Sequence, residues 1–152
     1  MNVDGAFLPS IQYVGTWGVL RNAHGQFLAA FSHRVNFVSS PLHSELLALK
    51  NGLEMLQAMQ ITKVVVESDC QVAVQAVSNE FSDLSPFSAL IAEVKGLLSD
   101  SEDVCIRFSP RQANTVAHRL ASFSFDSNVH HEWFVKAPGL ILDALMYDLN
   151  RT

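Results

Sequence analysis

Cysteine is scarce in this sequence, whose 152 residues include two, Cys70 and Cys105. So low a count suits reduced thiols in a reducing compartment better than the disulfide framework of a small secreted protein. The N-terminus also lacks the basic region and following apolar stretch of a secretory signal. We therefore expect an intracellular protein, with nucleus and cytoplasm both open.

Long hydrophobic runs are lacking as well. The longest are short and interrupted, as in Lys63–Glu67, and none approaches the roughly 20 apolar residues that a membrane span needs. We expect no membrane partner. Because 49% of the residues are hydrophobic and 16% are charged, the chain is neither disordered nor a charged arm. Its length suits one domain with a real core.

Basic residues are few: ten lysines and arginines stand against 15 acidic residues, a net charge of −5. Such a balance gives no overall attraction to a polyanion. Nucleic-acid binding would therefore need a local basic patch or bridging metal ions.

The first part of the chain predicts an antiparallel meander of three strands. Val3–Phe7 and Thr16–Asn22 are apolar stretches with β character, and Gln26–Val35 resumes after the turn signal of Asn22–Gly25. A helix follows, because Ser and Pro at 39–41 are helix-start residues and leucines then recur every three or four positions. We expect this helix to end near Gln60.

The remainder alternates between strand and helix patterns. Lys63–Ser68 is a β-branched run typical of a buried strand, and Val104–Phe108 alternates like a half-buried one. Helical spacing occupies 72–77 and 90–98, and a last helix is expected to begin at its cap, Asn114. The order βββαβααβα predicts an α/β fold: a five-stranded mixed sheet with helices on its faces.

Residues 1–126 would form this domain, and 127–152 a C-terminal extension. In the extension, 130–133 are interpreted as a polar tail segment, and apolar residues at 141–149 predict a short amphipathic helix. We expect the extension to pack on the domain or on a partner, with weak self-association through its helix as one outcome.

Three acidic residues occupy positions unusual for solvent-facing charge. Asp4 interrupts a strand, Glu45 falls on the leucine stripe of its helix, and Asp69 follows the valine strand at its carboxyl end. If the strands of Asp4 and Asp69 are parallel neighbours, the connecting helix brings Glu45 between them. Carboxylates this close would repel unless a cation sat among them, and hard oxygen ligands select Mg²⁺ or Mn²⁺.

Each acid also has a structural interpretation. The Asp4–Gly5 pair is common in turns, Glu45 near a helix N-terminus favours the dipole, and Asp69 is placed to cap a helix from Cys70. Each alone would more often be structural than functional. Because one sheet topology would bring all three acids together, we favour a metal-binding site over three separate structural roles.

Five motifs occur in order at the separations of a known family. They are Val3–Phe7 (VDGAF), Gly18–Asn22 (GVLRN), Ser44–Leu49 (SELLAL), Val65–Asp69 (VVESD) and Pro110–His118 (PRQANTVAH). Over roughly Val3–Phe125 the chain resembles the ribonuclease H-like domain of plant reverse-transcriptase-related proteins, within the ribonuclease H/retroviral integrase superfamily. The resemblance implies a ribonuclease H-like sheet of order 3-2-1-4-5, with helices on both faces.

The resemblance further implies an enzyme that hydrolyses the RNA strand of RNA–DNA hybrids with two divalent metal ions, Mg²⁺ or Mn²⁺. By position, Asp4, Glu45 and Asp69 match the first three catalytic, metal-binding carboxylates. The fourth acidic position falls on His118, where imidazole is a poorer Mg²⁺ ligand but acceptable to Mn²⁺. His118 would ligate a metal or assist proton transfer, or it marks weakened catalysis.

Nucleic-acid contacts are predicted in the loop beside His118. Arg111, Gln112 and Asn114 are placed to meet phosphate or ribose, although a plain loop and helix cap would use the same residues. Two functions follow: a metal-dependent hybrid endonuclease, which the three acids favour, or a catalytically weak module that binds nucleic acid or a protein, which His118 and the acidic balance favour.

Overall fold

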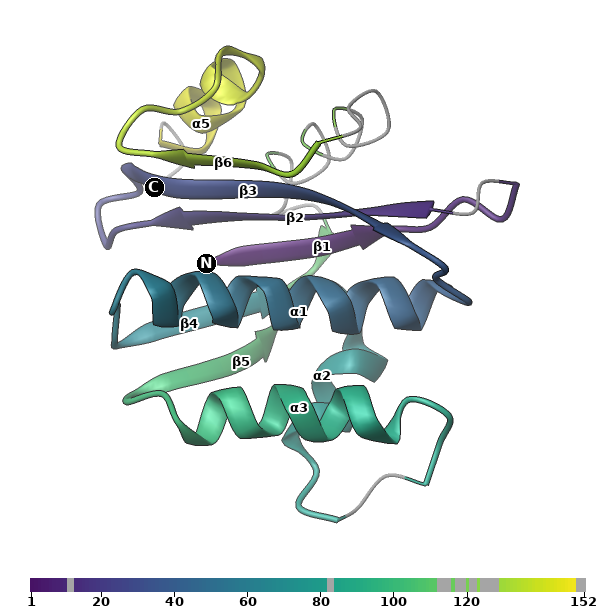
Figure 1. Cartoon of the computed structure of the whole chain (residues 1–152). Coiled ribbons are helices and arrows are strands. Elements are labelled where there is room, and N and C mark those ends of the chain that lie inside the picture. Colours follow the sequence, from purple (N-terminus) through teal and green to yellow (C-terminus); the bar gives the residue numbers. More distant parts are fainter. Residues whose placement is uncertain are drawn as a thin grey trace.

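A mixed β-sheet of six strands runs through the centre of the structure (Figure 1). The computed structural model describes residues 1–10, 13–81, 84–111, 116, 120, 123 and 129–149. The strand order is β5-β4-β1-β2-β3-β6. The strands are β1 (Asn2–Ala6), β2 (Tyr13–Arg21), β3 (Phe27–Asn36), β4 (Val64–Ser68), β5 (Val104–Phe108) and β6 (His131–Phe134).

The expected meander and parallel strands are confirmed. β1 pairs antiparallel with β2, and β2 with β3, whereas β1 pairs parallel with β4, and β4 with β5. The first five strands therefore have the order 3-2-1-4-5. Parallel strands end at the same sheet edge, so β1, β4 and β5 all point their carboxyl ends one way (Figure 1).

The sixth strand corrects the sequence analysis, which interpreted 130–133 as a polar tail segment. β6 pairs antiparallel with β3, with Ala30 opposite Trp133. The strand is four residues long, so its alternation is too brief to be recognised, and its partner lies about a hundred positions earlier. Pairing covers the backbone edge that β3 would otherwise expose.

Helices cover the sheet, and their bounds follow the predicted periodicities. The described helices are α1 (Pro41–Ala58), α2 (Gln71–Ser78), α3 (Ser88–Ser99), the 3-10 turn η2 (Gly139–Ile141) and α5 (Leu142–Leu149). Val116, Leu120 and Phe123 are helical as well, between β5 and β6. The start of α1 is as predicted, because Ser40 caps it through the His43 amide and Pro41 is its first residue.

Two apolar clusters lie on opposite faces of the sheet. The first joins β1, β3 and β4 to α1, α2 and α3, and includes Val3, Phe31, Leu46, Leu49, Leu53, Val66, Ala73, Ile91 and Val94. The second joins β2 and β3 to the segments after β5, and includes Trp17, Val19, Ala30, Val116, Leu120, Ile141, Ala144 and Leu145. The prediction of helices on both faces is therefore confirmed, and the C-terminal segment supplies part of the second cluster.

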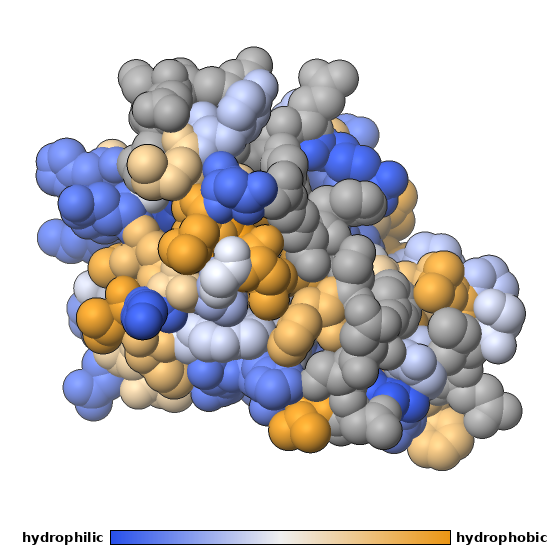
Figure 2. All heavy atoms as spheres, turned by 90° about the horizontal axis from the view of Figure 1, so that it is seen from above, coloured by the Kyte–Doolittle hydropathy of each residue, from blue (hydrophilic) through white to orange (hydrophobic). Residues whose placement is uncertain are grey.

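The side of the molecule that carries β6 and α5 shows apolar residues among hydrophilic ones (Figure 2). Exposed apolar side chains of these elements include Phe134, Leu142 and Met146. Among the described helices, none has both the length and the apolar character to cross a membrane.

Candidate metal-binding site

The carboxylates of Asp4, Glu45 and Asp69 converge at the edge where the parallel strands end. One oxygen from each lies within 4.8 Å of the other two. Asp4 is 5% exposed and Glu45 is 7% exposed, and the side chain of Asp69 is 6% exposed. The spatial arrangement expected from the sequence is therefore present.

Asp4 belongs to the middle of β1, so the interpretation of Asp4–Gly5 as a turn is wrong. These two residues lie opposite Trp17 and Thr16 of β2 in regular register. Gly5 instead allows the backbone of Ser44 in α1 to lie close to β1, because a Cβ on Gly5 would lie 2.4 Å from the Ser44 backbone oxygen. Absence of a side chain lets the start of α1 approach β1 at this point.

Glu45 is carried by the first turns of α1 and enters the site because of that approach. The Gly5 amide donates to Oε2 of Glu45 at 3.3 Å. The Glu45 carboxyl group lies close to that of Asp4 in the cluster. If both groups were ionised they would repel, so a proton on one of them relieves part of that repulsion.

Asp69 follows the end of β4 and is not the cap of α2. The N-cap residue is Cys70, whose amide donates to Oγ of Ser68 at 3.1 Å. The Asp69 carboxylate instead accepts a hydrogen bond from Nε of Arg111 at 3.0 Å. This ion pair was not foreseen, because no local pattern connects residues on separate loops.

Burial dominates the electrostatics of the site. Burial, followed by the nearby Asp69 charge, raises the pKa of Asp4 to about 6. Burial, followed by the charge and hydrogen bond of Asp4, raises the pKa of Glu45 to about 9. Carboxylates held in a place where ionisation is unfavourable are stabilised by a cation placed among them.

The donor set fits a hard divalent cation. All three side chains offer carboxylate oxygens, come from separate elements, and lie close enough to reach one metal ion. Oxygen donors favour Mg²⁺, Mn²⁺ or Ca²⁺ over the thiophilic metals. The cluster is therefore compatible with a metal site.

Of the other predicted site residues, Arg111 is described and lies at the site through its contact with Asp69. His118, Gln112 and Asn114 lie outside the described residues. Their predicted roles in metal or nucleic-acid binding stay predictions.

A comparison with family models settles the affiliation of the chain. The model described as "Reverse transcriptase-like" matches residues 2–124. The chain belongs to this reverse transcriptase-like family. A provisionally named ribonuclease H protein of Arabidopsis thaliana is 28% identical over 148 residues, 97% of this chain. The chain spans about a quarter of the length of that relative, 24%.

Solved structures show which fold this family member has. The RNase H1 of Halobacterium salinarum superposes with a TM-score of 0.74 and 21% identity, covering 82% of this chain and 95% of the other. An N-terminal RNase H domain from Mycobacterium tuberculosis superposes with a TM-score of 0.71 and 24% identity, covering 82% of this chain and 90% of the other. LC11-RNase H1, isolated from compost and solved in complex with an RNA/DNA hybrid, superposes with a TM-score of 0.73 and 19% identity, covering 82% of this chain and 94% of the other. The fold is therefore ribonuclease H-like.

Proposed function

We propose that this chain is a metal-dependent endonuclease that hydrolyses the RNA strand of RNA–DNA hybrids. The observation that carries the proposal is the convergence of Asp4, Glu45 and Asp69 in one buried cluster. The names of the Arabidopsis relative and of the RNase H1 structures support it. The hybrid bound to LC11-RNase H1 supports the choice of substrate.

Four residues would hold the metal ions: the carboxylates of Asp4, Glu45 and Asp69, and His118 at the fourth position. The chemistry supplied by two bound Mg²⁺ or Mn²⁺ ions is stabilisation of charge on the attacking and leaving oxygens. Because burial raises the pKa of Glu45 to about 9, its carboxyl group must lose a proton before it binds a metal ion.

Arg111 would contribute to substrate binding. Its side chain is 78% exposed although its Nε is fixed on Asp69, so the guanidinium presents its remaining donors to solvent beside the carboxylates. A guanidinium in that position suits a phosphate of the cleaved strand. Gln112 and Asn114 would add contacts to phosphate or ribose.

The alternative is a module that binds nucleic acid or a protein with little catalysis. Histidine at the fourth position and a net charge of −5 favour it. Weak self-association through α5 is a separate prediction, which no comparison supports. Ile141, Ala144 and Leu145 are buried within the chain, so any contact would use the exposed Leu142 and Met146.

Cleavage of a labelled RNA–DNA hybrid in Mg²⁺ and in Mn²⁺ tests the enzyme. Asp69→Asn is the matched control, because it keeps the size of the side chain and removes its charge. We expect cleavage by the wild type only. Cleavage by the wild type in Mn²⁺ but not in Mg²⁺ would indicate a weakened fourth ligand at His118. If neither the wild type nor Asp69→Asn cleaves the hybrid in either metal, the proposed endonuclease activity is excluded.

A further inference from the structure

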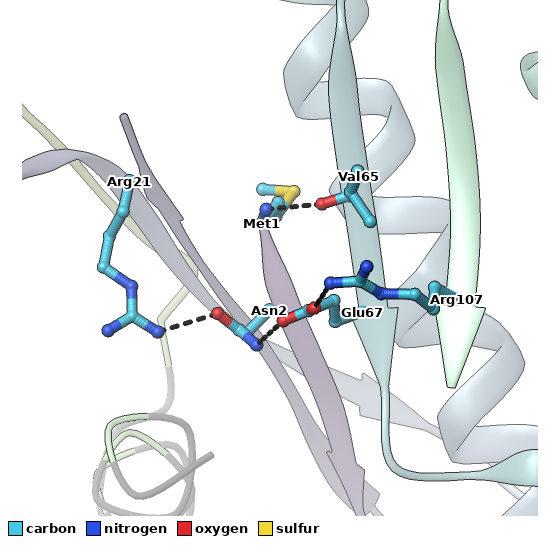
Figure 3. Close-up of polar contacts among 6 residues, drawn as sticks. All are labelled: Met1, Asn2, Arg21, Val65, Glu67 and Arg107. Carbon is cyan, nitrogen blue, oxygen red and sulfur yellow. Dashed lines mark hydrogen bonds and ion pairs between the residues drawn. The ribbon is translucent and has the colours of Figure 1, made fainter. Parts of the chain in front are cut away.

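Four polar side chains form a continuous row across four neighbouring strands (Figure 3). Arg21 of β2 donates from Nη2 to Oδ1 of Asn2 in β1 at 2.8 Å, and Nδ2 of Asn2 donates to Oε2 of Glu67 in β4 at 2.8 Å. Arg107 of β5 donates from its Nη2 to the other oxygen of Glu67. The row therefore crosses β2, β1, β4 and β5 without a gap.

Asn2 is the centre of this row. It is 7% exposed, and its carbonyl oxygen and amide nitrogen are both engaged, each by a different strand. Those partners fix which end of the amide faces β4, because only the nitrogen donates to a carboxylate. A buried amide satisfied from both sides fixes the relative position of the strands that it joins.

The junction between β1 and β4 is short. Asn2 of β1 pairs with Glu67 of β4, and the backbone bonds at this junction include those from the Glu67 amide to the Met1 oxygen and from the Met1 nitrogen to the Val65 oxygen, both at 2.7 Å. The side-chain bond between Asn2 and Glu67 adds a connection to those that the backbone makes at this single paired position.

Two residues beyond this pair on each chain segment are Asp4 and Asp69. Asn2 and Asp4 are two positions apart on β1, so their side chains lie on the same face of the sheet, and Asp69 lies just past the end of β4, two positions after Glu67. Carboxylates as close as these repel when both are ionised. A connection beside them resists their separation.

We propose that Asn2 and Glu67 are positioning residues, which hold Asp4 and Asp69 at the separation required by divalent metal ions. The inference rests on the metal site of the proposed function. Neither residue needs to touch a metal: the Asn2–Glu67 bond sets the distance between strands, and the strands carry the ligands. Partners of this kind change metal affinity while leaving the ligands themselves intact.

Calorimetric titration of the whole chain with Mn²⁺ tests the proposal without any need for cleavage. Asn2→Ala removes both hydrogen bonds of the amide, and we expect it to weaken Mn²⁺ binding by about tenfold or more. Glu67→Gln keeps an oxygen acceptor for the Asn2 amide, and we expect it to bind Mn²⁺ as the wild type does.

A stability control separates positioning from general weakening of the fold. Val94→Ala removes buried volume in α3, away from the row, and we expect a lowered Tm with unchanged Mn²⁺ affinity. If Asn2→Ala does not fold, Asn2→Asp keeps its shape, sets a carboxylate against Glu67, and should also weaken binding.

Wild-type Mn²⁺ affinity in Asn2→Ala, or in a folded Asn2→Asp, would overturn the proposal. The metal site is checked separately with Asp69→Asn. If Mn²⁺ binding by the wild type does not depend on Asp69, the proposed function loses its site and the positioning role ends with it. If Mn²⁺ binding depends on Asp69 but not on Asn2, the positioning role is wrong and the metal site of the proposed function stands.

Discussion

Nε of Arg111 lies 3.0 Å from Oδ2 of Asp69, which connects the segment after β5 to the carboxylate cluster at the end of β4. The two side chains differ in exposure: that of Arg111 is 78% exposed and that of Asp69 is 6% exposed. A solvent-exposed cation therefore contacts a buried anion. A metal ion on Asp69 must share this carboxylate with Arg111 or displace it.

Replacement of Arg111 by Met should therefore affect metal and nucleic acid in opposite directions. Mn²⁺ binding should strengthen by at most about fivefold, because exposed ion pairs contribute below about 1 kcal/mol. Binding to an RNA–DNA hybrid should weaken, because a phosphate partner is lost. Calorimetry measures the first effect and fluorescence anisotropy with a labelled hybrid measures the second.

Lys50→Met is the control for that variant, because Lys50 is also a cation in an ion pair, but with Glu93, outside the row that contains Asn2 and Glu67. We expect it to leave Mn²⁺ affinity unchanged. Weaker Mn²⁺ binding by Arg111→Met would show that the guanidinium supports the ion and does not compete with it.

Glu45→Gln should stabilise the protein at alkaline pH when divalent ions are chelated. The pKa of Glu45 rises from its ordinary 4.5 to about 9 in the fold, because of burial and the neighbouring Asp4. Between these values the folded state holds more protons than the unfolded state, so stability falls as pH rises. The neutral amide avoids this loss.

Urea unfolding in EDTA, at about pH 5 and about pH 8, measures the effect. We expect Glu45→Gln to raise the free energy of unfolding by at least about 1 kcal/mol at the higher pH, and by less at the lower pH. Glu54→Gln, on the same helix with a half-exposed side chain, should change it by less than about 0.5 kcal/mol. A wild-type stability that increases towards pH 8 would contradict this view of the site.

Gly5→Ala should damage both the fold and the site. The new Cβ would meet the backbone of Ser44 at 2.4 Å, so α1 must move away from β1 and carry Glu45 with it. We expect a loss of about 1–3 kcal/mol in the free energy of unfolding and weaker Mn²⁺ binding. Gly96→Ala is the control: no atom lies within 4 Å of the added carbon, and a helical alanine should stabilise α3 by about 0.5–1 kcal/mol. Equal stability of the two variants would refute the close-approach argument.

A chain truncated after residue 126 should lose much of its stability. The boundary between a domain at 1–126 and an extension at 127–152 is a prediction, whereas the structure shows that the extension supplies β6 and buries Ile141 beside Trp17 and Val19. Removal exposes this side of the sheet and the edge of β3. We expect a lower Tm by circular dichroism, and Ile141→Ala alone should cost about 2–4 kcal/mol. An unchanged Tm after truncation would establish 1–126 as an independent domain.

Patterns within the sequence determined most of the elements and the composition of the carboxylate cluster. Apolar stretches with β character and a turn signal between them predicted the meander, leucines at helical spacing predicted α1, and Ser40 with Pro41 marked its beginning. Asp4 and Glu45 were recognisable because charge is unfavourable on a strand interior and on an apolar helix face. These signals depend on neighbours close along the chain, so a single sequence carries them.

Tertiary structure alone decided the contacts between distant residues. Asn2 and Glu67 are 65 positions apart, Asp69 and Arg111 are 42 apart, and β6 pairs with a strand about a hundred positions earlier. Each of these contacts depends on sheet order and register, which fix distances in space but leave no periodic trace along the chain. The sequence by itself therefore determined which acids would gather, and only the assembled sheet decided how far apart they lie and which side chains hold them there.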